Sequence, residues 1–173
     1  MDMTRTAEHG GLNRRAAYAS ITVATLLLAM KAYAVISTGS TAMLGSLADT
    51  GLDLIASLAT LLGVWIGAQP ADANHRFGHG KAEAFASLLQ GGLVFASAAL
   101  IGQEALNRLA HPEPVSHEGL GIAVMAVSIV LTVGLIAAQS AVLKQTGSVA
   151  VSGDRAHYAA DLASNLVSMV GIG

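Results

Sequence analysis

Cysteine is absent from this sequence, and charged residues are scarce. Without cysteine the chain can form neither disulfides nor a thiolate metal site, so a soft site of the kind that selects Cu(I) is excluded. Any metal ligands must therefore be carboxylates and imidazoles. Asp, Glu, Lys and Arg make up 12% of the residues, against about 25% in an average soluble domain.

Signatures of several function classes are also missing. No His-Glu-x-x-His sequence is present, which argues against an intramembrane metalloprotease, and no Walker-type Gly-Lys-Ser/Thr sequence suggests use of ATP. The formal net charge of −2 leaves no electrostatic footprint for nucleic acid. We therefore expect neither an enzyme nor a nucleic-acid-binding protein.

Hydrophobic residues make up 53% of the chain, which places it in the membrane class. A polar N-terminal tail over 1–17 precedes a predicted transmembrane domain over 18–173. Basic residues before the first apolar run would also fit a cleaved signal peptide, but the run is long and lacks a clear cleavage site. We expect an all-α polytopic bundle in contact with membrane lipid, with spans at about 18–38, 41–68, 81–109, 119–143 and 148–173.

The basic residues predict the orientation of the bundle. Cytoplasmic segments of membrane proteins carry an excess of Lys and Arg. With the N-terminus inside, only Arg108 lies at an outer turn. The cytoplasmic segments then hold Arg5, Arg14, Arg15, Arg76, Lys81, Lys144 and Arg155. We therefore expect an inner-membrane protein with a cytoplasmic N-terminus, and five passes place residue 173 outside.

Two acidic residues lie within the second apolar run, where charge is costly. Asp49 and Asp53 are four residues apart, so a helix places both on one face. A carboxylate near the middle of a bilayer costs roughly 2.5–3.5 kcal/mol on insertion scales. Such residues usually face a protein interior or a water-filled cavity, where they handle an ion or a proton.

The fifth run repeats this spacing with His157 and Asp161. Asp49 lies about 8 residues, or ~12 Å, from the outer end of its helix, and Asp161 about 13 residues, or ~20 Å, from the inner end. In a hydrocarbon core of about 30 Å these two meet at similar depth, and His157 then falls near Asp53. Four ligands from two antiparallel helices are thus expected to converge.

Three carboxylates and one imidazole suit a tetrahedral divalent ion, with Zn²⁺ the leading candidate. Histidine binds metal only when neutral, and clustered carboxylates also take up protons, so metal and protons compete for one site. A protein that opened such a site alternately to either side would exchange a divalent cation for protons. The alternative is that the four residues only make hydrogen bonds between helices.

Three segments together resemble the cation diffusion facilitator family of divalent-metal/proton antiporters. They are SLADTGLD at 46–53, QPADANHRFGHGKAE at 69–83 and HYAAD at 157–161. The likeness covers nearly the whole chain, from about Arg14, and is strongest to the bacterial ferrous-iron and zinc efflux branch.

This resemblance implies a transport site formed by Asp49, Asp53, His157 and Asp161. It also implies homodimers and export of Zn²⁺, with Fe²⁺ or Cd²⁺ as alternatives, against inward proton flow. In the zinc-type branch Asp72, His75 and His79 match the ligands of a second site in the loop after the second helix. The alternative there is a solvated loop with ordinary surface histidines.

Family members usually have six spanning helices followed by a cytoplasmic ferredoxin-like domain. We expect this chain to stop before the sixth helix and to lack that domain. A rival reading is therefore a membrane protein that binds or senses metal without transporting it. Among other polar residues, Lys31 could snorkel or neutralise an acid such as Glu104. Gln90 and Gln139 are expected to bridge helices, with a place along a water path as the alternative.

Overall fold

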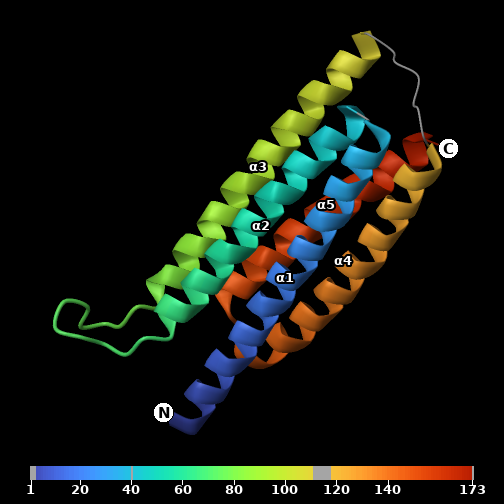
Figure 1. Ribbon diagram of the computed structural model, residues 1–173. Coiled ribbons are helices and arrows are strands. Elements are labelled where there is room, and N and C mark those ends of the chain that lie inside the picture. The colour runs from blue at the N-terminus through green and yellow to red at the C-terminus, as the bar shows by residue number, and fades with distance from the viewer. Residues whose placement is uncertain (1–2, 40, 111–117, 173) are drawn as a thin grey trace.

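Five helices make up the protein in a computed structural model that describes residues 3–39, 41–110 and 118–172 (Figure 1). The helices are α1 (Met3–Thr38), α2 (Thr41–Gly67), α3 (Lys81–Ala110), α4 (Glu118–Thr146) and α5 (Val149–Ile172). The described part of the chain contains no β-strand. The predicted all-α class is therefore confirmed.

The predicted span positions agree with these helices within a few residues, except at the beginning of the chain. Helix α1 begins at Met3, whereas the first span was expected from about Tyr18. No proline interrupts residues 3–38, and alanine, leucine and arginine, which favour helix, are frequent there. Residues 3–17 of the polar tail are therefore an extension of the first helix.

Two glycines end helices in the left-handed conformation that other residues rarely adopt. Gly39 has a φ of 64° after α1, and Gly147 has a φ of 63° after α4. Each amide donates back to a carbonyl of the last turn, that of Val35 and of Leu143 respectively. The α4–α5 connection is consequently very short, and it places α5 beside α4 in the antiparallel direction.

Four helices are long and apolar enough to cross a membrane among the residues described. These spans are Glu8–Ser37, Leu44–Gly67, Lys81–Gln103 and Gly121–Thr146. Helix α5 has 24 residues but carries Asp154, Arg155 and Asp161. That α5 also crosses the membrane remains a prediction, and it rests on the burial of Asp154 and the partial burial of Asp161 against other helices.

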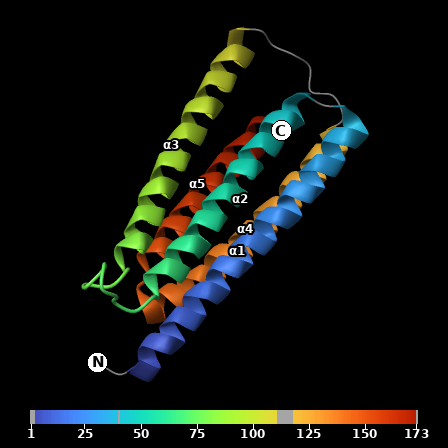
Figure 2. The ribbon, with the colours of Figure 1, turned by 60° about the vertical axis from the view of Figure 1, so that its left-hand side comes forward.

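The helices form a bundle in which successive helices run in opposite directions (Figures 1 and 2). Helix α1 packs on α2 and α4, α3 packs on α2 and α5, and α4 packs on α5. The N-terminus, the loop between α2 and α3, and the α4–α5 turn lie at one end of the bundle (Figure 1). This is the end at which the predicted cytoplasmic segments meet.

Polarity is distributed as expected for a bundle surrounded by lipid. The buried residues are mostly small or polar, whereas many large apolar side chains are exposed. Helices α2 and α3 approach very closely at Gly63, where an added Cβ would come within 2.6 Å of the Cβ of Ala86. Exposed apolar side chains include Leu26, Ile36, Leu62, Phe85, Phe95 and Val130.

Candidate functional site

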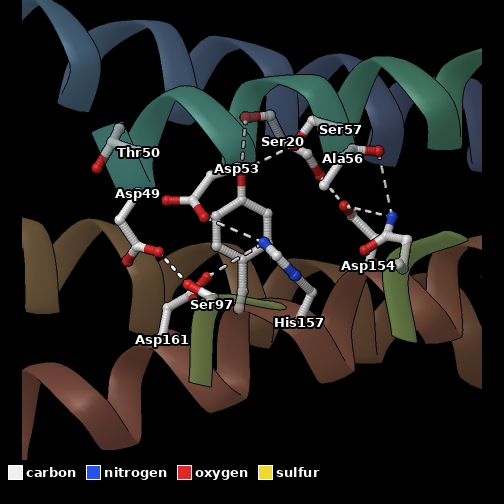
Figure 3. Close-up of polar contacts among 12 residues, drawn as sticks. Ser20, Asp49, Thr50, Asp53, Ala56, Ser57, Ser97, Asp154, His157 and Asp161 are labelled. Atoms are coloured by element: carbon white, nitrogen blue, oxygen red, sulfur yellow. Dashed lines mark hydrogen bonds and ion pairs between the residues drawn. The ribbon is translucent and has the colours of Figure 1, made fainter. Parts of the chain in front are cut away.

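Three of the four predicted intramembrane ligands lie together between α2 and α5 (Figure 3). Asp53, His157 and Asp161 each offer one ligand atom, and these atoms lie within 4.8 Å of one another. Nε2 of His157 is 3.0 Å from Oδ1 of Asp53 and 3.6 Å from Oδ2 of Asp161. The contact between His157 and Asp53 is the one expected from their depths in the two helices.

Helical spacing accounts for this arrangement locally. His157 and Asp161 are four residues apart on α5, so they lie one above the other on the face that meets α2. Asp53 and His157 are buried, at 6% and 1% exposure. Nδ1 of His157 and Oδ2 of Asp161 are buried without a hydrogen-bond partner in the described part of the chain. Two carboxylates therefore face one ring nitrogen with little competing hydrogen bonding.

The fourth predicted ligand, Asp49, lies one turn along α2 from Asp53 but outside the group of three. Its Oδ1 accepts a hydrogen bond from the hydroxyl of Ser97 on α3 (Figure 3). Ser97 was not expected from the sequence at this site, because a serine in an apolar helix carries no signal of its own. A neighbouring helix thus holds the Asp49 carboxylate beside the other three residues.

A second buried polar cluster lies around Asp154, three residues before His157 on α5 (Figure 3). Oδ2 of Asp154 accepts hydrogen bonds from Oγ of Ser20 at 2.5 Å and Nε2 of Gln139 at 2.7 Å. Oδ1 accepts one from Nε2 of Gln90 at 3.0 Å. Gln90 also donates to the hydroxyl of Thr60.

This Asp154 cluster joins all five helices, because its members come from α1, α2, α3, α4 and α5 in turn. The prediction that Gln90 and Gln139 bridge helices is confirmed. The role of Asp154 was missed, although its place three residues before His157, on the same helical face, is a signal that could have revealed it.

Tyr158 and Lys31 connect the two clusters to the surrounding helices. The hydroxyl of Tyr158 lies 2.9 Å from Oγ of Ser57 and donates to the carbonyl of Ser20 at 3.3 Å. Nζ of Lys31 donates to Oγ1 of Thr50 at 2.6 Å. Lys31 is buried, so it does not snorkel, and the side chain of Glu104, its suggested partner, lies outside those described.

The three predicted loop ligands also lie together, in the connection between α2 and α3. Ligand atoms of Asp72, His75 and His79 lie within 4.8 Å of one another. Oδ2 of Asp72 is 3.6 Å from Nε2 of His79, and the two imidazole rings are 4.4 Å apart between centroids. Unlike the first group, Asp72 and His75 are exposed to solvent.

The backbone of the loop holds Asp72 in place. Its Oδ1 accepts hydrogen bonds from the backbone amides of His75 at 2.6 Å and Asn74 at 2.9 Å, which closes a tight turn. The hydrogen bond from the His75 amide, followed by that from Asn74, lowers the pKa of the Asp72 carboxyl below its ordinary value. Asp72 therefore presents a negative charge to the two histidines over a wide pH range.

The chain matches a known protein family and several named proteins over most of its length. The family model described as the cation efflux transmembrane domain matches residues 17–173. Proteins named cation-efflux pump FieF from Klebsiella pneumoniae, Escherichia coli and Citrobacter koseri are each 39% identical over 165 residues. Those matches cover 95% of this chain but 55% of each relative, so the chain spans about half their length.

A match over nearly the whole chain, together with two groups of metal-ligand side chains at the predicted positions, leads to one conclusion. The chain belongs to the cation efflux family, also called the cation diffusion facilitators, and it carries that family's transmembrane domain.

Proposed function

We propose that this chain is the transmembrane part of a secondary transporter that exports a divalent cation from the cytoplasm in exchange for protons. One observation carries the proposal: Asp53, His157 and Asp161 converge from two helices in the spanning part of the bundle. Ionisable side chains at that depth are costly, and they are retained where an ion or a proton is handled. The related proteins named cation-efflux pumps support the same direction of transport.

Asp49 completes the proposed transport site as a fourth ligand. Its carboxylate lies one helical turn from Asp53 and accepts a hydrogen bond from Ser97. We propose that a metal ion replaces Ser97 as the partner of this carboxylate. Three carboxylates and one imidazole are a ligand set that suits tetrahedral Zn²⁺. We therefore propose Zn²⁺ as the cargo, with Fe²⁺ and Cd²⁺ as the alternatives to be compared.

Protons are the proposed counter-ion, because every ligand in the set also binds a proton. Metal binding requires neutral histidine and ionised carboxylates, so loading the site from the cytoplasm releases protons and protonation from the other side expels the metal.

The loop residues Asp72, His75 and His79 form a second proposed metal site. The exposure of Asp72 and His75, and the position of the loop at the end of the bundle that holds the N-terminus, favour a regulatory or metal-delivering role over a place on the transport path. A homodimer in the inner membrane, with the N-terminus in the cytoplasm, is proposed from the family resemblance and the positions of the basic residues.

Flux measurement tests the function directly. The protein is reconstituted into liposomes that hold a metal-sensitive dye and a pH-sensitive dye, and a Zn²⁺ gradient is imposed. We expect zinc movement in one direction to drive proton movement in the other. Binding of Zn²⁺ without any flux would instead support the rival reading, a membrane protein that binds or senses metal.

A further inference from the structure

Lys31 is a buried cation whose hydrogen bonds go to neutral oxygens on α2. It is 8% exposed, although it lies only about two turns before α1 ends at Thr38. Nζ donates to Oγ1 of Thr50 at 2.6 Å and to the carbonyl of Ser46 at 3.4 Å. A lysine that served only to reach the membrane surface would extend toward a helix end. Lys31 instead points at a neighbouring helix.

The part of α2 that Lys31 contacts is the part that carries the proposed ligands. Thr50 directly follows Asp49 and precedes Asp53 by three residues. The hydrogen bond from Lys31 to Thr50 places the ammonium beside the turn of α2 that carries Asp49 and Asp53. The ammonium is thus held by Thr50 close to the site without occupying a ligand position.

The ammonium of Lys31 changes the net charge of the proposed transport site. Ionised Asp49, Asp53 and Asp161 contribute −3, and neutral His157 contributes nothing. A bound divalent ion brings the sum to −1, and Lys31 brings it to zero. Net charge is expensive in a dehydrated protein interior surrounded by lipid. With the four proposed ligands in these states, their charges and that of the divalent ion sum to zero only when Lys31 is included.

We propose that Lys31 is a built-in counter-charge of the transport site, a specificity-determining residue that makes the site neutral for a divalent ion and weakens its hold on that ion. This inference rests on the proposed function. Repulsion between the ammonium and the metal raises the dissociation constant and speeds release, which a transporter requires because cargo that binds too tightly does not leave.

The test compares removal of the Lys31 charge with removal of the Thr50 hydroxyl, to which Lys31 donates a hydrogen bond. Lys31→Met removes the charge, Lys31→Arg keeps it, and Thr50→Val removes the hydrogen-bond acceptor while leaving the charge in place. Zinc binding is measured by titration calorimetry on the purified protein at pH 7.0, which favours the charged form of Lys31. Transport is measured in liposomes at the same pH.

We expect Lys31→Met to bind Zn²⁺ at least tenfold more tightly, with a lower KM and a lower maximal rate of transport. Lys31→Arg and Thr50→Val should bind within threefold of the unchanged protein. A lysine that only donates a structural hydrogen bond would instead make Lys31→Met and Thr50→Val behave alike. If Lys31→Met does not yield folded protein, Lys31→Gln removes the charge but can still donate to Thr50, and the same tightening is expected.

Unchanged or weaker zinc binding by a folded Lys31→Met or Lys31→Gln variant would overturn the proposal. Asp161→Asn is measured in parallel to separate this outcome from a failure of the transport site itself. Normal zinc binding by Asp161→Asn would refute the site, whereas loss of binding there, combined with an unaffected Lys31→Met, would refute only the role of Lys31.

Discussion

Nε2 of His157 on α5 lies 3.0 Å from Oδ1 of Asp53 on α2, although 104 positions separate the two residues in the chain. The same nitrogen is 3.6 Å from Oδ2 of Asp161, one turn further along α5. One imidazole therefore lies between carboxylates of two helices. This arrangement is the basis of the predictions on transport and metal selectivity.

Removing one carboxylate from this group should abolish metal-driven transport. Asp53→Ala and Asp161→Ala each remove one of the four proposed ligands and one negative charge, so we expect Zn²⁺ flux in liposomes to fall to the level of empty vesicles. Helix content by circular dichroism should stay unchanged. Thr25→Ala serves as the control, because Thr25 is exposed and its hydroxyl donates to the carbonyl of Ile21 in its own helix. Undiminished flux in either alanine variant would refute the proposed site.

Exchange of the imidazole for a carboxylate should alter the choice of metal. Imidazole suits Zn²⁺, whereas an all-carboxylate site suits harder ions such as Mn²⁺. We therefore expect His157→Asp to raise the ratio of Mn²⁺ to Zn²⁺ transport by at least tenfold, measured by competition in liposomes. An unchanged ratio would mean that His157 does not contact the metal.

The Asp154 cluster should contribute to stability rather than to metal binding. Asp154→Ala removes the acceptor that Ser20, Gln139 and Gln90 share, and weakening the hydrogen bonding of buried polar groups costs about 1–3 kcal/mol. We expect the free energy of unfolding in detergent to fall by about this amount, while Asp154→Asn, which keeps one acceptor oxygen, loses less. Equal stability of the alanine variant would show that the cluster is not a structural junction.

The acidity of Asp72 can be measured directly, because the residue lies in an exposed loop. The backbone amides of His75 and Asn74 favour the ionised carboxylate, so its pKa is below the ordinary value of 3.8. The ionised carboxylate of Asp72 stabilises the turn fully above pH 3.8. This stabilisation is lost as the pH falls through the lower pKa that Asp72 has in the folded protein. A titration of the carboxyl carbon by NMR in metal-free protein should give a midpoint below 3.8. A midpoint at or above it would contradict the observed turn.

The absence of native cysteine makes the orientation testable with single substitutions. Ser37→Cys and Ala73→Cys place one thiol at each end of the bundle, both at exposed positions. In intact cells a membrane-impermeant maleimide should label Ser37→Cys and should reach Ala73→Cys only after the cells are opened. The reverse pattern would place the N-terminus outside.

Local patterns in the chain were enough to predict the helices and the two ligand pairs. A long apolar run predicts a helix wherever it lies, and a spacing of four residues places Asp49 with Asp53, and His157 with Asp161, on one face each. The depth of each residue follows from its distance to the end of its own helix. For this reason the contact between Asp53 and His157 could be predicted before any packing was known.

Only the tertiary structure decided which faces of the five helices meet. It directs Lys31 to Thr50, places Ser97 on Asp49 and gathers donors from three other helices around Asp154, across as many as 134 positions of the chain. No local spacing encodes such contacts, because they depend on how side chains of different sizes let each pair of helices approach. Sequence alone determined what each helix could offer, and packing determined which of those groups came within bonding distance.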